Sequence, residues 1–571
     1  MTVENPMTAL NTIAALAQDI TQRIDSLAFT TGSYKSLSEA LTLKLIQGID
    51  GALSVALSRV RVLRNSMSPV NSLPPEILTA IFGCLTESAK TPATVAGIAS
   101  PREWVPITHV CKYWRESALG FPFMWSPIVF EPEDIVNESS LPYQCLRRSL
   151  GAPLDVQIRC DGGVDTRVWE TLAARSSRLR QLRVTDLLEI DQLRHLRHEA
   201  PLLQTLHIQI SPYLLDKRWA GEDLPDELPE LFAGNTPALR HLHLGLFTSF
   251  STNRFENLVV LQLSHQIYRE TSDLSHLFAL LQASLNLEEL SLTDCDLDSA
   301  HEGPVLTDER FLPMYRLRRL AFVGCHATIV SSVLARIELG HDELALVCKD
   351  WMPSDRPLTT IFPSKAASRL YPLETVTALD IRYDSAEVVA TGARTTVRLK
   401  FEHDLDVIEG IAPSLGFLFP LHAVQSLALA GIELHDVAFW RGFFGAMPVL
   451  ARLALWLPPT AMDKWLGALR TGGGGAYPAP QLDMLRVFPP YAGIWETVTA
   501  MVQARADDGH RICMLNVVMS EKNRDAAIRS AFEGLDTASL ELFVDRVAQD
   551  VVPEYRQELA VPEEHRTFIE Q

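Results

Sequence analysis

The chain has 571 residues, of which 47% are hydrophobic and 21% are charged, and its formal net charge at pH 7 is −19. This length exceeds one ordinary core and predicts roughly three or four domains' worth of material, unless a repeat array extends without enlarging a single core. The acidic balance argues against a nucleic-acid partner, which needs a basic surface. No run of about 18 residues is free of polar interruption, so no membrane span is expected.

The cysteines and the amino terminus predict a reduced, intracellular protein, cytoplasmic or nuclear. Eight cysteines are scattered without a C-x-x-C pair or a His/Cys cluster at zinc spacing, so we expect neither a metal site nor a cofactor. Several lie within apolar periods, where a free cysteine behaves as a small hydrophobe. The opening MTVENPMTALNTIAALAQ lacks the basic start of a secretory signal.

Residues 1–66 are expected to form a helical lead. Apolar residues recur every three or four positions in two runs that TTGSYKS separates, as one buried face of a helix requires. These positions are Ile13, Leu16, Ile20, Ile24 and Leu27, then Leu41, Leu45, Leu53, Leu57, Val60 and Leu63. The pattern favours a helical hairpin packed on the rest of the chain. A short coiled coil for dimerisation is the alternative, although clean heptads are few.

A broad apolar helix is predicted within SLPPEILTAIFGCL, residues 72–85. Two prolines fit its first turn, where missing N–H groups cost nothing, and Glu76 places a negative charge near the positive end of the helix dipole. Large side chains then follow at Ile77, Leu78, Ile81, Phe82 and Leu85. A small module cannot bury so wide a stripe internally, and large exposed apolar patches usually mark partner sites.

A second helix follows in WVPITHVCKYWRESALGFPFMWSPI, residues 104–128. Its expected apolar face comprises Ile107, Val110, Cys111, Trp114 and Leu119. Gly120 and Pro122 are expected to end it.

Together the two segments, residues 71–130, resemble an F-box. The motif L-P-x-E-[IL]-L-x-x-I-F-x-x-L is matched by Leu73, Pro74, Glu76, Ile77, Leu78, Ile81, Phe82 and Leu85. The later V-C-[KR]-x-W-R is matched by Val110, Cys111, Lys112, Trp114 and Arg115, and the closing P-x-x-W by Pro122 and Trp125. The stretch TESAKTPATVAGIASPREW between the halves is long for this family.

The resemblance implies docking onto the Skp-type adaptor of a cullin–RING ubiquitin ligase. The residues expected to bind this adaptor are Leu73, Pro74, Ile77, Leu78, Ile81, Phe82, Val110 and Trp114. Of these, Trp114 is equally consistent with the core of the module.

From residue 150 to residue 520 the pattern is that of an irregular solenoid. A template L-x-x-L-x-φ, where φ is apolar, is matched ten times, starting at Leu179, Leu203, Leu239, Leu258, Leu287, Leu317, Val376, Val424, Leu450 and Leu482. The two longest gaps hold ELALVC (343–348) and TTVRLKF (395–401), either of which fits a degenerate strand. Each unit is expected to give a short strand and a helix or loop, so that neighbours stack into one continuous core.

This spacing resembles leucine-rich repeats. The family usually continues with an Asn or Cys that bonds the turning backbone, and here only Cys295 and Cys325 are clear candidates. The resemblance implies an α/β fold whose strands bind a protein target through their variable positions. Candidate target-binding residues are Arg240, His241, His243, Glu288, Glu289, Arg318 and Arg319.

The carboxyl-terminal region is expected to leave the repeat pattern. RICMLNVVMS, residues 511–520, reads as one more strand. Residues 521–571 are expected to give one or two helices through Val551 and then an acidic, frayed tail. The arrangement of helical lead, F-box and repeats looks like the F-box proteins abundant in mushroom-forming fungi.

No catalytic constellation is found, so an enzyme is not expected. HLRHEA (195–200) has the wrong order for zinc proteases, and TGGGGAYP (471–478) lacks the Lys-Ser/Thr of a phosphate loop. The leading hypothesis is therefore a substrate-receptor subunit that holds the adaptor through the F-box and an unknown protein substrate through the solenoid. The alternative is a repeat scaffold outside any ubiquitin pathway, with the F-box-like segment as its cap. An enzyme of unrecognised class ranks third.

Overall fold

The computed structural model describes most of the chain. The described residues are 6–29, 39–87, 98, 100–132, 139–161, 163–220, 222, 224–297, 311–340, 343–351, 362, 369–383, 385–401, 405–431, 435–456, 459–470, 477–488, 493–520 and 526–552. The chain divides into two compact units: a helical unit, Met1–Thr86 with Arg102–Phe121, and a sheet unit, Glu87–Pro101 with Pro122–Gln571.

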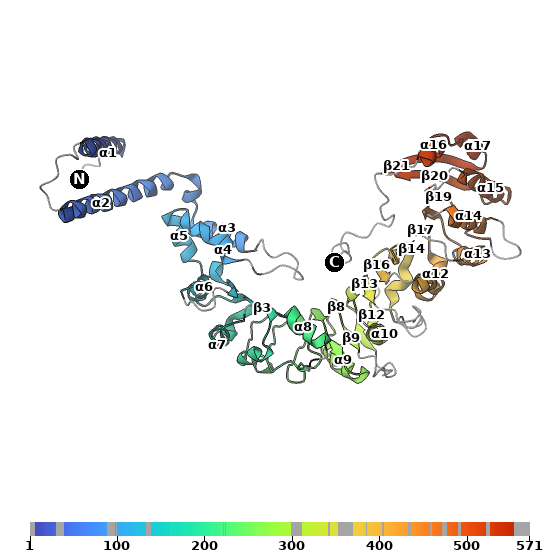
Figure 1. The fold of residues 1–571 in the computed structure, drawn as a ribbon, viewed down its shortest axis with the longest axis horizontal. Helices are drawn as coiled ribbons and strands as arrows, with labels where there is room; N and C mark the ends of the chain where they lie inside the picture. The colour runs from blue at the N-terminus through green and yellow to red at the C-terminus, as the bar shows by residue number, and fades with distance from the viewer. Residues whose placement is uncertain are drawn as a thin grey trace. The chain divides into compact units, whose positions relative to one another are not determined.

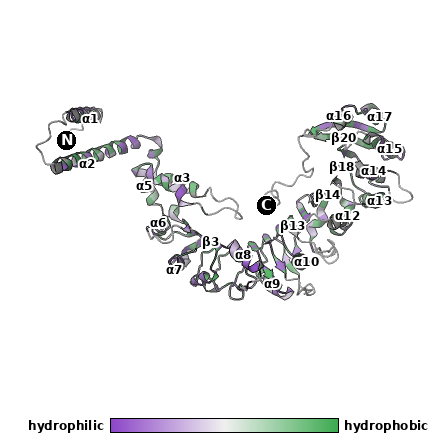
Figure 2. Ribbon diagram, viewed as in Figure 1, coloured by the Kyte–Doolittle hydropathy of each residue, from purple (hydrophilic) through white to green (hydrophobic). Residues whose placement is uncertain are grey.

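The amino-terminal part of the chain is helical, as predicted. Its elements are α1 (Pro6–Phe29), α2 (Glu39–Ser66), η1 (Pro69–Ser72), α3 (Pro75–Glu87), α4 (Pro101–Trp104), η2 (Val105–His109) and α5 (Lys112–Leu119). Figure 2 shows hydrophobic and hydrophilic residues side by side on α3. The TTGSYKS stretch lies outside the described residues.

The buried faces expected on the first two helices are not observed. The exposed side chains are Ile13, Leu16, Ile20, Ile24, Leu45, Leu57, Val60 and Leu63, and Leu53 is half-buried. The side chains of Leu27 and Leu41 lie outside the described part. Periodicity thus predicted the helices correctly and their burial wrongly, because it reports an amphipathic face and not what covers that face.

The sheet unit alternates strands with helices, which makes the protein an α/β fold as expected. The strands are β1 (Pro127–Phe130), β2 (Leu154–Arg159), β3 (Leu179–Leu187), β4 (Thr205–Ile210), β5 (His241–Gly245), β6 (Val260–Ser264), β7 (Ile267–Tyr268), β8 (Glu289–Thr293), β9 (Asp296–Leu297), β10 (Leu312–Met314), β11 (Arg319–Val323), β12 (Ile337–Leu339), β13 (Leu344–Trp351), β14 (Val376–Arg382), β15 (Glu387–Gly392), β16 (Thr395–Phe401), β17 (Ser426–Ala430), β18 (Arg452–Trp456), β19 (Met484–Val487), β20 (Ile512–Ser520) and β21 (Val544–Val552).

Helices connect most of these strands. They are η3 (Pro122–Trp125), α6 (Leu141–Arg148), α7 (Thr166–Ala173), η5 (Ser176–Arg178), η6 (Ile190–His195), α8 (Pro212–Trp219), η7 (Phe232–Gly234), η8 (Thr271–Asp273), α9 (Leu274–Gln282), α10 (Ala327–Arg336), η10 (Tyr371–Thr375), α12 (Leu405–Leu418), η11 (Leu421–Ala423), α13 (Val437–Gly445), α14 (Pro459–Ala468), α15 (Ile494–Asp507), α16 (Ala526–Glu533) and α17 (Thr537–Glu541). Figure 1 shows the labelled strands β8, β13 and β16 on one side of the sheet unit and α9, α10 and α12 on the other.

One long, mostly parallel sheet runs through the unit. Its 17 described strands pair in the order β1–β2–β3–β4–β5–β6–β8–β11–β13–β16–β15–β14–β17–β18–β19–β20–β21. The first, fourth and sixth template positions form the core. In the unit that starts at Leu203, for example, Leu203, Leu206 and Ile208 are all fully buried. Successive units stack these apolar rows, so the core is continuous.

A residue in the left-handed conformation lies near the end of the strand in five of these repeats. Asp186, Leu246, His265, Asp294 and Gly324 all have positive φ, and each precedes the position where the family places Asn or Cys. At Gly324 a Cβ atom would collide with the carboxylate of Asp294, so glycine is favoured there. The backbone N–H of Asp294 donates to Val323 O in the next unit at 2.7 Å, which ties the turns together.

In three adjacent repeats, the side chain of the residue after this turn contacts a backbone carbonyl of the preceding repeat. The thiol of Cys325 donates to Leu292 O at 3.2 Å, and that of Cys295 lies 3.8 Å from Leu263 O. Both predicted turn cysteines therefore contact the backbone of the preceding repeat. The sequence pattern did not identify Gln266, which is fully buried and donates to Phe247 O in the same way.

The two stretches predicted as possible degenerate strands do form strands, whereas β15 and β21 differ from the prediction. TTVRLKF and ELALVC are strands, β16 and β13, and they pair in parallel. However, β15 was not predicted, and it lies antiparallel between β14 and β16, so the sheet is mixed at this point. The prediction of helix through Val551 is wrong after α17, because β21 pairs in parallel with β20. The expected tail lies outside the described residues.

The described helices bear on the expectation that no segment spans a membrane. None of them combines the length and the apolar character that a bilayer span requires. All eight cysteines are described, and each is free of disulfide bonding.

Candidate functional site

Helix α3 begins where its sequence predicts. Pro75 occupies its first turn, and the N–H of Leu78 donates to Pro74 O at 3.0 Å as the first full turn closes. Glu76 lies in this first turn, close to the positive end of the helix dipole. The prolines and the acidic residue thus fix the start of the helix, and with it the direction of each apolar side chain that follows.

The broad apolar stripe of α3 divides into a buried and an exposed side. Leu78 and Phe82 are 0% and 1% exposed, whereas Ile77, Ile81 and Leu85 are 50%, 47% and 51% exposed. The exposed three recur every four residues, so they form a row along one side of the helix. We call Ile77, Ile81 and Leu85 the exposed row.

Helix α5 is tied to α3 by aromatic side chains. The ring of Trp114 packs on that of Phe82, with centroids 5.2 Å apart, and its indole N–H donates to Asn71 Oδ1 at 2.6 Å. Tyr113 donates its hydroxyl proton to Leu73 O at 2.6 Å. Trp114 is half-buried, so most of its surface contributes to the inside of the module.

The start of α5 explains the V-C-[KR]-x-W-R pattern. Cys111 is the N-cap residue, and its sulfur accepts a hydrogen bond from the N–H of Trp114. Arg115 reaches back to donate from Nε to Thr108 O at 2.8 Å. The cysteine and the arginine therefore stabilise the turn before the helix, and Val110 beside them remains exposed.

The expected adaptor-binding residues thus occupy two environments. Leu78 and Phe82 are buried, and Leu73 and Trp114 are half-buried. Pro74, Ile77, Ile81 and Val110 are exposed and accessible to a partner. Leu85, which the sequence analysis placed in the motif but not among the binding residues, belongs with the exposed set.

On the sheet, polar side chains form a row at the fifth template position. In the register of strands β3 to β6, Arg183 is paired with His207, His207 with His243, and His243 with Gln262. We call these four residues the inner strip. All four are half-buried. Gln157 continues the row on β2, but it is buried and its Oε1 accepts from the N–H of Ile98.

The two histidines of the inner strip are neutral at pH 7. Their rings are 4.0 Å apart between centroids. Burial lowers the pKa of His207 to about 2, with contributions from His243 and Arg183, and burial lowers the pKa of His243 to about 4. His207 Nε2 and His243 Nδ1 are buried and have no hydrogen-bond partner within the described ranges.

The third template position carries the carboxylates, and these are already paired. Glu289 lies 2.7 Å from Arg319 Nε and accepts from Gln262 Nε2 at 2.9 Å. On β2 and its neighbour, Asp155 accepts from Arg180 Nε at 2.8 Å. The predicted target residues Glu289 and Arg319 therefore form one ion pair. His241 is half-buried on β5, on the same face as His243.

The remaining predicted target residues occupy the second template position, just before the strands. Arg240 donates to Leu239 O at 2.7 Å, and Arg318 lies 3.7 Å from Glu343. Glu288 is half-buried. These residues flank the strands and are not brought together into one cluster. Sequence reasoning missed Arg183 and His207, which reading the fifth template position unit by unit would have identified.

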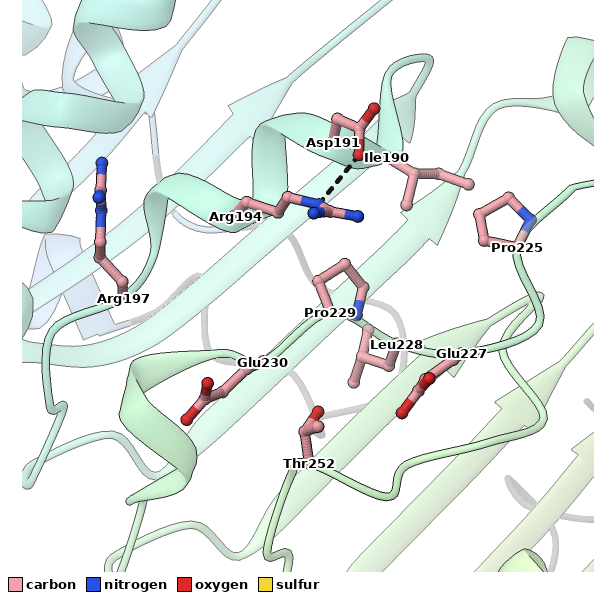
Figure 3. A pocket seen from close by; sticks show the side chains of 10 residues that line it. All are labelled: Ile190, Asp191, Arg194, Arg197, Pro225, Glu227, Leu228, Pro229, Glu230 and Thr252. Atoms are coloured by element: carbon pink, nitrogen blue, oxygen red, sulfur yellow. Dashed lines mark ion pairs between the residues drawn. The ribbon is translucent and has the colours of Figure 1, made fainter.

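A pocket lined by both polar and apolar residues lies between η6 and the segment 225–230. Its volume is about 500 Å³. Figure 3 shows Arg194 and Asp191 on one side, 3.0 Å apart, and Glu227 and Glu230 on the other. Its rim carries both acidic and basic side chains, and the Asp191–Arg194 pair is strongly exposed. We therefore assign no role to this pocket. Among the described residues, no group of three or more His, Cys, Asp or Glu side chains is arranged to hold a metal ion.

Comparison with known families agrees with the helical geometry. Residues 70–131 match the F-box-like family. A search of curated proteins finds no match. The chain therefore carries an F-box-like domain, a kind typical of non-catalytic adaptor proteins, and a long, mostly parallel sheet follows it.

Proposed function

We propose that this protein is the substrate-receptor subunit of a cullin–RING ubiquitin ligase of the SCF type. The observation that carries the proposal is the exposed row of α3 within a segment that matches the F-box-like family. Large apolar side chains in a row on a small helical module are typical of a partner surface. The partner that the family implies is a Skp-type adaptor.

In this proposal the adaptor contacts Pro74, Ile77, Ile81, Leu85 and Val110. Leu78, Phe82 and Trp114 act indirectly, because they hold α3 and α5 together. The leucine-rich-repeat-like sheet binds the target, and the protein itself catalyses no covalent step. It accelerates ubiquitin transfer by raising the effective concentration of the target at the ligase.

The test is a pull-down of the full chain with a purified Skp-type adaptor. The double variant Ile77→Glu/Ile81→Glu places two charges in the exposed row, and we expect roughly a hundredfold loss of binding or more, since buried apolar anchors dominate interface energies. Leu202→Glu is the matched control, because Leu202 is a similarly exposed apolar residue on the sheet unit. Failure of the unaltered chain to bind the adaptor contradicts the proposal.

The alternative is a repeat scaffold with no role in ubiquitin transfer, in which the F-box-like segment caps the solenoid. It predicts no adaptor binding and a sheet that loses stability when the exposed row is charged. The same double variant separates the two, because adaptor docking predicts a sheet unit with unchanged thermal stability.

A further inference from the structure

The inner strip combines features that indicate a ligand of negative charge. Its members come from four consecutive strands, β3 to β6, and point to the same side of the sheet because they are register partners. One member is a permanent cation, two are imidazoles and one is an amide. The strip itself contains no carboxylate, although the whole chain has a net charge of −19.

The carboxylates at neighbouring positions of the repeats already have hydrogen-bond or ion-pair partners. Glu289 is bound by Arg319 and Gln262, and Asp155 by Arg180. His265, which acts on His243, lies 3.4 Å from Asp294. Thus each of these three carboxylates has an arginine, amide or imidazole partner nearby.

Two imidazole nitrogens in the strip lack partners. His207 Nε2 and His243 Nδ1 are buried, and neither has a hydrogen-bond partner in the described part of the chain. A buried polar atom without a partner costs free energy that a bound ligand can recover. The nearby guanidinium of Arg183 provides the planar fork that matches a carboxylate.

We propose that the inner strip recognises an Asp- or Glu-rich segment of the target protein, by carboxylate contacts to Arg183, His207 and His243. This proposal rests on the proposed function only in naming the ligand as the ubiquitination target. The four side chains span about 14 Å at the usual strand spacing, which equals about four residues of extended peptide. The segment therefore crosses the strands and places alternate carboxylates near the cation and the imidazoles.

Binding is coupled to proton uptake. A carboxylate beside His207 and His243 favours their charged forms, which burial disfavours in the free protein. The groups that face His207 are Arg183, His243 and Gln209. Those that face His243 are His207, Arg183, Gln262, Ser264 and His265. Because the bound state holds more protons, affinity rises as the pH falls from about 7.5 to about 6.0.

The experiment uses the full chain and a fluorescein-labelled peptide of five Asp-Glu repeats, with an Asn-Gln peptide of equal length as the uncharged probe. Fluorescence anisotropy measures the dissociation constant. We expect binding of the acidic peptide alone, tighter at about pH 6.0 than at about pH 7.5. Arg183→Gln is expected to weaken it about tenfold or more, as for other hydrogen bonds to charged groups.

Variants separate recognition from general charge attraction. His207→Gln/His243→Asn is expected to abolish the pH dependence, whereas Arg194→Gln on η6 and His276→Asn on α9 leave affinity and pH dependence unchanged. Equal binding of both peptides, or equal loss in the control variants, overturns the proposal. Adaptor pull-down of the same proteins keeps the two proposals distinct, since adaptor binding without peptide binding rejects only the strip, and the reverse rejects only the ligase role.

Discussion

The helical unit and the sheet unit differ in where their large apolar residues lie. On α3 the residues Ile77, Ile81 and Leu85 remain exposed beside a buried pair, Leu78 and Phe82. On the sheet the apolar template positions are buried, and the exposed face carries polar side chains such as Arg183 and His207. Exposed apolar side chains therefore indicate the partner surface of the helical unit, whereas partly buried polar side chains indicate that of the sheet unit.

The largest effect is expected from the buried pair of α3. Phe82→Ala removes the ring that packs on Trp114 and leaves a cavity, so we expect a loss of about 3–5 kcal/mol in the free energy of unfolding of the helical unit. Hydrogen exchange measures it, with fast exchange in α3 and α5 and slow exchange in the strands. Ile81→Ala is the matched surface control and is expected to change stability by less than about 0.5 kcal/mol. Equal effects of both variants contradict the assignment of inside and outside.

In the sheet unit, buried Arg505 has a structural role comparable to that of Phe82 in the helical unit. Arg505 is fully buried and donates to Leu469 O, Pro478 O and Ala479 O, with its guanidinium 5.2 Å from the Tyr477 ring. Arg505→Met removes all three hydrogen bonds, and among the described residues only Ala479 O keeps a second donor, the N–H of Leu482, so we expect a loss of about 3 kcal/mol in chemical denaturation of the sheet. Exposed Arg470→Met is the control. If the two variants lose the same amount of stability, the hydrogen bonds of Arg505 do not stabilise the sheet unit.

The inner strip makes the stability of the sheet depend on pH. The pKa values of His207 and His243 are about 2 and about 4 in the folded protein, below the ordinary value of 6.5. The unfolded chain therefore takes up protons first, and stability falls as pH drops below about 6.5. The slope is about 1.4 kcal/mol per pH unit for each histidine, and the contribution of His243 levels off near pH 4. Denaturant midpoints at about pH 7.5 and about pH 5.5 test this, and the double variant His207→Gln/His243→Asn is expected to lose that part of the slope.

The smallest effect concerns the turns of the repeats. Gly324→Ala places a Cβ atom against the Asp294 carboxylate at a positive φ, so we expect a loss of about 1–2 kcal/mol. Gly467 on α14 has no neighbouring atom within 4 Å of the position that a Cβ would take, and Gly467→Ala is expected to stabilise by about 0.5–1 kcal/mol. Thermal melts of the two variants should thus shift in opposite directions.

The sequence predicted most of the sheet because the repeat template is local. Apolar residues with the spacing of Leu203, Leu206 and Ile208 recur in each template match. The turn cysteines Cys295 and Cys325 lie at the same distance from the start of their units. In contrast, Val544, Val547, Ala548 and Val551 recur at helical spacing, and yet they lie on β21. Pairing with β20 outweighs that local pattern, which one segment alone cannot reveal.

The candidate site was only partly predictable for a related reason. The stripe on α3 predicts a helix with a wide apolar surface, but not which half is covered. That choice depends on Trp114, which lies 32 residues away from Phe82 and packs on it. Likewise His207 and His243 become neighbours only through the register of β4 with β5.

Carbene footprinting of the full chain with and without a Skp-type adaptor identifies the side chains that the adaptor covers. We expect labelling of Ile77, Ile81 and Leu85 to fall strongly when the adaptor is added. Labelling of Leu202 and Tyr213, two exposed residues of the sheet unit outside its strands, is expected to stay constant. An adaptor that does not bind, or one that binds while the exposed row remains fully labelled, would contradict the account.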